Sequence, residues 1–140
     1  MLFNINTDLS LKTICGYIFY PFTIIIGVPI SDAGVVSKII GERLIVTEVV
    51  AYKDLAAALQ QNLLQYPQRS AVLATYALCG FAHLASMAIF VGGVCALAPD
   101  KIRNISTAAI RALIAATLAC LMTGAVAGTF YTGSSLLFGR

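Results

Sequence analysis

Long apolar runs lie on both sides of one more polar stretch of this chain. A membrane-spanning helix needs about 20 predominantly apolar residues. Residues 11–28 form the first run and predict a span, with a kink at Pro21 because proline cannot donate the helical hydrogen bond. Residues 112–131 are uncharged and predict the clearest span. Gly124 and Gly128 lie four residues apart within it, a spacing that permits close helix packing.

A longer apolar run covers residues 71–98 and differs from a plain span. It contains no Asp, Glu, Lys or Arg and is longer than a straight crossing requires. Gly80 and His83 interrupt its middle. Excess length combined with central glycine and polar residues predicts a broken span rather than a continuous helix.

The stretch between these runs, residues 31–68, carries charged side chains and only short apolar pieces. None of these pieces reaches the length of a span. Apolar segments of about 10–14 residues in a membrane protein are more often re-entrant or interfacial. The pattern therefore predicts a re-entrant helical hairpin with Thr47 and Glu48 near its tip.

Composition argues for a membrane-embedded chain. Of the 140 residues, 59% are hydrophobic and 11% are charged. An average soluble domain has about 45–50% apolar residues and about 25% charged residues. So few charges argue against a water-soluble monomer, and such high hydrophobicity argues against intrinsic disorder. The net charge of +3 is spread along the chain, so no nucleic-acid partner is expected. We expect one all-α integral membrane domain over residues 1–140, with about three transmembrane helices, one of them broken, plus the re-entrant hairpin.

Glu48 is a candidate functional residue because it lies among valines, where an ionised carboxylate is unfavourable. Insertion scales place an acidic residue at the centre of a membrane helix at about +3 kcal/mol. Such residues usually face a cavity, an ion or a substrate. The alternative is that Glu48 lies at the membrane interface and reaches water, as the nearby Lys53 and Asp54 would.

His83 is the single histidine and lies in the longest uncharged run. On a continuous helix, Cys79, His83 and Ser86 would share one face. A hydrogen-bonded interior histidine is the default interpretation, and a substrate contact or a metal ligand is the alternative. Two ligands are too few for structural zinc, and a catalytic Cys–His pair lacks an orienting third group. We therefore predict no metal site and no enzymatic activity.

Three motifs resemble the C-terminal part of the concentrative nucleoside transporters, the NupC-type permeases. GERLIVTEVVAY at residues 41–52 resembles the family's second re-entrant hairpin, Gly-x-Lys-x-x-x-Asn-Glu-Phe-Val-Ala-Tyr. ALCGFAHLAS at residues 77–86 resembles the broken-helix pattern Ala-Leu-Cys-Gly-Phe-Ala-Asn-Phe-Ser-Ser. IRALIAATLA at residues 110–119 resembles the start of the last span. The likeness covers nearly all of residues 7–130, in the family's order.

The resemblance implies nucleoside transport across the plasma (inner) membrane by symport coupled to sodium or a proton. It implies no cofactor beyond that coupling ion, contact with the lipid bilayer, and assembly as a homotrimer. The family's first hairpin carries a Gln-Thr/Ser-Glu motif that does not occur in these 140 residues. We therefore expect a C-terminal fragment that works with a separate N-terminal half.

The resemblance also implies a ribose-binding site. Glu48 matches the hairpin glutamate that hydrogen-bonds a ribose hydroxyl, and Ser86 matches a serine that contacts the sugar. His83 occupies the place of an asparagine that is another ribose ligand. Phe81 lies where the family has an aromatic residue near the nucleoside.

Several positions depart from the family's motifs. Thr47 replaces the hairpin asparagine, Val49 replaces its phenylalanine, and His83 replaces the broken-helix asparagine. These departures leave an alternative open, namely a non-transporting membrane interaction or scaffold protein, or the relic of a truncated transporter gene.

Overall fold

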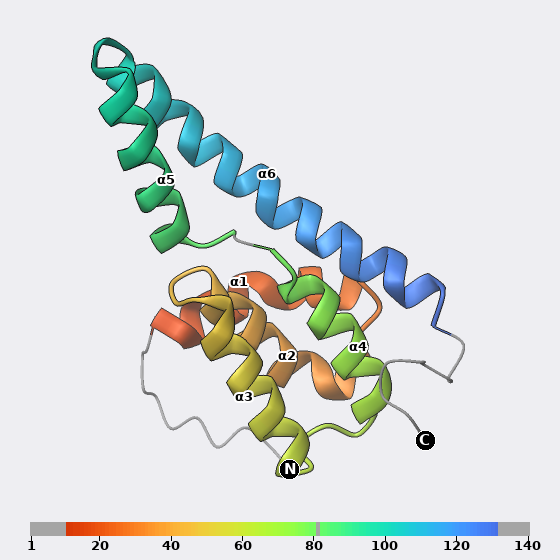
Figure 1. Cartoon of the computed structure of the whole chain (residues 1–140). Coiled ribbons are helices and arrows are strands. Elements are labelled where there is room, and N and C mark those ends of the chain that lie inside the picture. Colours follow the sequence, from red (N-terminus) through yellow and green to blue (C-terminus); the bar gives the residue numbers. More distant parts are fainter. Residues whose placement is uncertain (1–10, 81, 132–140) are drawn as a thin grey trace.

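A computed structural model describes residues 11–80 and 82–131, and these residues contain helices and no strand. The chain order is α1 (Leu11–Ile25), α2 (Ile30–Arg43), α3 (Glu48–Gln60), α4 (Pro67–Leu78), α5 (Leu84–Leu97), the 3₁₀ turn η1 (Pro99–Lys101) and α6 (Ile102–Thr129). Helices α1 to α4 form a cluster, and α5 and the first part of α6 project from it as a long hairpin (Figure 1). The all-helical expectation is confirmed for the described residues.

Helix α1 crosses α2 at close range. It continues past Pro21 to Ile25 and ends before Gly27, whose φ of 96° is one that other residues rarely adopt. A Cβ atom added at Gly41 would lie 2.7 Å from the backbone carbonyl carbon of Cys15, so the two helix backbones touch there. Helix α1 has 15 residues, a length of about 22 Å, which is less than the roughly 30 Å hydrocarbon core of a bilayer.

Helices α2 and α3 form a hairpin whose connection is residues 44–47. The base of this hairpin is fixed to α4 by Asp32, which is fully buried. Its carboxylate accepts hydrogen bonds from the backbone N–H groups of Gln65 (2.7 Å) and Tyr66 (2.9 Å) and from the Ser70 hydroxyl (2.5 Å). Asp32 thereby satisfies the backbone donors of the two residues that precede α4 and ties them to α2.

The apolar run at residues 71–98 is interrupted between α4 and α5. Helix α4 ends at Leu78, and Cys79 has an extended backbone. Gly80 has a φ of 151°, which favours glycine. A new helix begins at Leu84. The segment is thus two helices with an irregular connection.

Helix α6 has 28 residues and packs against α4 in its C-terminal half. A Cβ atom at Gly124 would lie 3.2 Å from the carbonyl oxygen of Leu73, and one at Gly128 would lie 2.5 Å from the Leu73 side chain. The predicted role of these glycines in close packing is confirmed. The helix begins at Ile102, ten residues before the span predicted at 112–131, and its first turns include Arg103 and Arg111.

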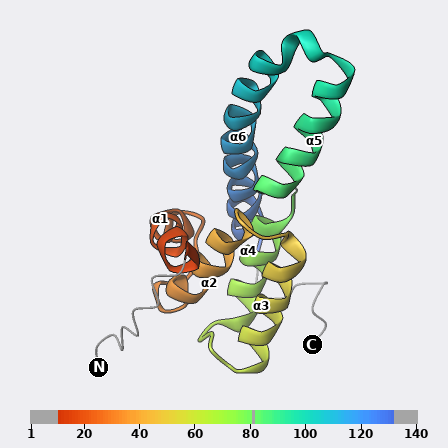
Figure 2. The same ribbon diagram turned by 90° about the vertical axis from the view of Figure 1, so that its left-hand side faces the viewer.

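The hydrophobic core lies among α1 to α4 and the C-terminal half of α6. Helix α5 has no buried residue, and Phe90 and Leu97 on it are 73% and 88% exposed. Figure 2 shows α5 and the first part of α6 rising away from the other helices. Within residues 11–80 and 82–131, one helix, Pro99–Thr129, is long and apolar enough to cross a membrane, and α1 and α5 are shorter apolar helices. The predicted number of spans and the re-entrant placement of the hairpin stay predictions.

Candidate functional site

Glu48 lies where the α2–α3 connection turns into α3. It is the first residue of α3, and Thr47 is the N-cap with extended backbone. An acidic residue in the first turn interacts favourably with the positive end of the helix dipole. The Glu48 side chain is 20% exposed, and its Oε2 atom is buried. The hairpin therefore places a carboxylate at its tip, facing protein rather than open solvent.

His83 is the N-cap of α5, and its side chain is 6% exposed. The imidazole Nδ1 accepts a hydrogen bond from the backbone N–H of Ser86 at 3.1 Å, and the Ser86 hydroxyl donates to the carbonyl oxygen of His83 at 3.0 Å. A side-chain acceptor at the N-cap satisfies one of the free N–H groups of the first turn. The irregular connection after α4 therefore ends in a well-fixed imidazole.

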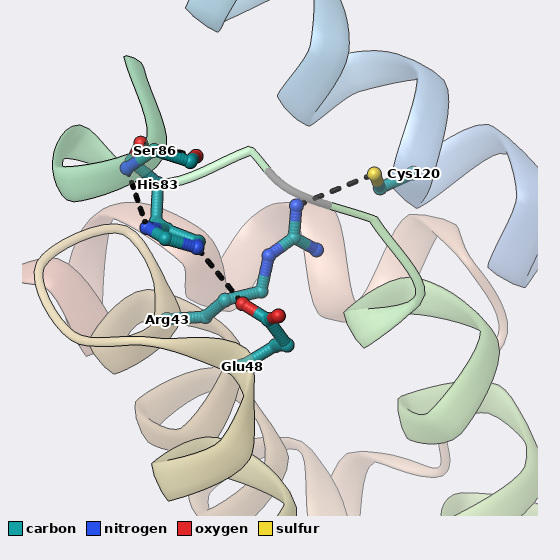
Figure 3. A network of polar contacts seen from close by, with 5 residues as sticks. All are labelled: Arg43, Glu48, His83, Ser86 and Cys120. Atoms are coloured by element: carbon teal, nitrogen blue, oxygen red, sulfur yellow. Dashed lines mark hydrogen bonds and ion pairs between the residues drawn. The ribbon is translucent and has the colours of Figure 1, made fainter. Parts of the chain in front are cut away.

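The two side chains meet across the gap between hairpin and broken helix (Figure 3). His83 Nε2 lies 2.8 Å from Glu48 Oε2, within ion-pair distance, and this buried oxygen has no hydrogen-bond partner in the part of the chain that the structure describes. Because Nδ1 is the acceptor for Ser86, the proton of a neutral imidazole is on Nε2. That nitrogen lies against the carboxylate, and this contact places Glu48 beside the start of α5.

A backbone contact fixes the same junction. The N–H of Leu84, the first residue of α5, donates to the carbonyl oxygen of Leu44 in the hairpin connection at 3.1 Å. The N-termini of α3 and α5 therefore converge on the Glu48–His83 pair. Two helix N-termini contribute positive potential, which stabilises the Glu48 carboxylate.

Of the other residues predicted from the sequence, the structure places Ser86 at the junction. Ser86 is joined to His83 by its two cap bonds and is half-buried. Phe81 lies outside the described residues. The expectation that Cys79, His83 and Ser86 share one helical face is wrong, because the helix stops at Leu78 and Cys79 belongs to the preceding cap.

Two residues that the sequence did not single out lie beside this junction. Arg43, the last residue of α2, is 3% exposed, and its guanidinium bonds the carbonyl oxygen of Ala77 at the end of α4 and the Cys120 thiol on α6. Arg43 stands where the family's hairpin motif has lysine, which was an available signal. Nothing in the sequence around Cys120 indicates its partner, which lies 77 positions away.

The arrangement is suited to binding a polar, neutral solute. Among the described residues, no three His, Cys, Asp or Glu side chains gather to hold a metal ion. A carboxylate accepts hydrogen bonds from hydroxyl groups, and an imidazole and a serine hydroxyl can each donate or accept. These are the groups that recognise a sugar diol.

Comparison with known proteins gives consistent matches. Residues 1–128 match the family model described as "Na+ dependent nucleoside transporter C-terminus". Solute carrier family 28 member 3 of Homo sapiens is 41% identical over 132 residues, which cover 86% of this chain and 19% of that protein. The putative nucleoside permease NupX of Escherichia coli (strain K12) is 37% identical over 121 residues, covering 86% of this chain and 29% of that protein.

A solved structure shows the same fold. CNTnw in an inward-facing substrate-bound state superposes with a TM-score of 0.80 at 35% identity, covering 94% of this chain and 32% of that chain. The chain spans 19% of the length of its mammalian relative and 32% of that solved transporter.

Proposed function

The chain belongs to the Na⁺-dependent, concentrative nucleoside transporter family as its C-terminal region, and from this premise we propose that it forms the sugar-binding part of an ion-coupled nucleoside symporter. This is a transporter family rather than an enzyme family. The 2.8 Å contact between Glu48 and His83 carries the proposal. It joins the hairpin tip to the start of α5 through the two side chains best suited to bind ribose.

In the proposed site, Glu48 accepts hydrogen bonds from ribose hydroxyls. Its Oε2 is buried against His83, so its other oxygen, Oε1, is the one that binds the sugar. Ser86 adds a hydroxyl from α5, and His83 contacts the carboxylate. The family resemblance gives Phe81 the role of an aromatic residue near the nucleoside. A buried carboxylate that is already oriented loses little entropy on binding, which favours affinity.

The remaining parts of the proposal concern the assembled transporter. The hairpin α2–α3 re-enters the membrane, and α4–α5 and α6 cross it, with α1 as a further apolar segment. Substrate sites of inverted-repeat transporters lie between two halves near mid-membrane. In the proposal, this chain therefore works with an N-terminal part of the fold. The assembled transporter is a homotrimer of the plasma membrane, and its coupling ion is sodium or a proton.

Uptake of radiolabelled uridine tests the proposal. The full chain would be co-expressed with the N-terminal part of the solved relative CNTnw in a bacterial strain that lacks nucleoside uptake. The same N-terminal part with its own C-terminal region is the positive control. We expect uptake with this chain, and a loss of at least about 10-fold on Glu48→Gln, because hydrogen bonds to a charged group contribute about 1.5–3 kcal/mol.

Asp100→Asn is the matched control, since it makes the same carboxylate-to-amide change at an exposed residue of η1. It should leave uptake unchanged. Absence of uptake with this chain while the positive control transports would contradict the proposal and favour the scaffold or relic alternative. Equal uptake by Glu48→Gln and Asp100→Asn would remove Glu48 from the sugar site.

A further inference from the structure

Arg43 carries a buried positive charge that forms no ion pair with a carboxylate among the described residues. It is 3% exposed, and in residues 11–80 and 82–131 the structure gives it no ion pair. A buried charge is retained only when other groups compensate it. The partners here are the carbonyl oxygen of Ala77 and the Sγ of Cys120, the latter at 3.3 Å.

These partners belong to the end of α4 and to the middle of α6. The last carbonyl groups of a helix lack intrahelical partners, and a cation there interacts favourably with the helix dipole. Cys120 in turn donates to the carbonyl oxygen of Cys79 at 3.5 Å. A Cβ atom at Gly80 would lie 2.7 Å from Cys120 Sγ, so α6 packs directly on the break.

The hairpin tip therefore makes a series of contacts along the connection between α4 and α5. Arg43 holds the side where α4 ends, the Leu44 carbonyl bonds the first residue of α5, and Glu48 contacts His83 (Figure 3). Arg43 and Glu48 are five positions apart, so the contact of Arg43 with α4 constrains where Glu48 meets His83.

We propose that Arg43 is a positioning residue that clamps the hairpin tip to α4 and α6 and thereby sets Glu48 against His83. It touches no substrate. Its effect on transport rests on the proposed function, whereas its effect on the geometry of the junction does not.

Hydrogen–deuterium exchange on the purified full chain in detergent tests the clamp directly. In Arg43→Met, amide exchange in peptides covering residues 79–87 and 44–48 should rise about 10-fold or more, since bonds to a charged donor are lost. Exchange in residues 105–118 of α6 should stay at the wild-type rate, which excludes global unfolding. Arg43→Lys keeps the charge and one bond, and should exchange within about 3-fold of wild type.

Arg69→Met is the matched control, because Arg69 also donates to a backbone carbonyl beyond a helix end, that of Gly27, at 3.3 Å. It should leave exchange at residues 79–87 unchanged. In the uptake assay, Arg43→Met should raise the KM for uridine about 10-fold, and Arg43→Lys should restore it.

Wild-type exchange at residues 79–87 in Arg43→Met would overturn the proposal. Faster exchange in Arg43→Met with an unchanged KM for uridine would show that Arg43 does not act on the sugar site. If no variant or wild-type chain transports uridine, the proposed function fails and the exchange result still decides the clamp.

Discussion

At the scale of the residue, His83 performs two tasks with its two ring nitrogens. Nδ1 caps α5 by accepting from Ser86, and Nε2 lies 2.8 Å from the Glu48 carboxylate. The family resemblance places asparagine here, whose side chain also offers one acceptor and one donor. Asparagine is among the strongest N-cap residues. The replacement by histidine therefore keeps the hydrogen-bonding pattern and changes the shape.

This interpretation predicts different outcomes for two substitutions of His83. His83→Asn should keep the cap and retain uridine uptake. His83→Leu should lose the cap, worth about 1 kcal/mol, and also the 2.8 Å contact with Glu48, so it should unfold at a lower temperature than His83→Asn. Thermal unfolding of the purified chain in detergent measures this difference. Equal unfolding temperatures for the two variants would show that the imidazole contacts contribute nothing to stability.

The two partners in the site were each suggested by the sequence, but their contact was not. Glu48 stood out as a carboxylate among valines, and His83 as the single histidine in an uncharged run. They are 35 positions apart, and no local periodicity relates a hairpin tip to a helix break. The Arg43–Cys120 contact was less predictable still, because a thiol in an apolar helix is ordinarily a small packing residue.

At the scale of the element, glycine decides how closely the helices approach. The central glycine and polar residues of the run at 71–98 predicted a break, and Gly80 supplies it with a φ of 151°. The spacing of Gly124 and Gly128 predicted close packing of the last span. Helix α6 begins before the span predicted at residues 112–131, because an exposed helix tolerates the arginines of its first turns.

Two glycines of α2 provide a matched test of the close helix crossing. A Cβ at Gly41 would meet the Cys15 backbone at 2.7 Å, whereas one at Gly34 meets nothing within 4 Å. Gly41→Ala should destabilise the chain by about 1–3 kcal/mol through overpacking. Gly34→Ala should stabilise it by up to about 1 kcal/mol through helix propensity. Thermal unfolding measures both, and a stabilised Gly41→Ala would refute the close crossing of α1 and α2.

At the scale of the whole molecule, the chain has one packed cluster and one exposed hairpin. Helix α5 has no buried residue, and only 17% of the most apolar 18-residue stretch of Pro99–Thr129 is buried. A groove between α5 and α6, with a volume of about 590 Å³, has a mostly apolar lining that includes Met87, Phe90 and Ala112. Such surface is unfavourable in water. It is consistent with a piece of a membrane transporter whose relatives are three to five times longer.

The most direct test of the proposed sugar site removes the Glu48 carboxylate and one ribose hydroxyl, separately and together. Uridine and 3′-deoxyuridine would be compared as competitors of uridine uptake by the co-expressed chain, in wild type and in Glu48→Gln. If the Glu48 carboxylate binds the ribose diol, the wild type should prefer uridine by about 10-fold or more, and the variant should lose most of this preference. An undiminished preference in Glu48→Gln would contradict the assignment of the hairpin carboxylate to the sugar.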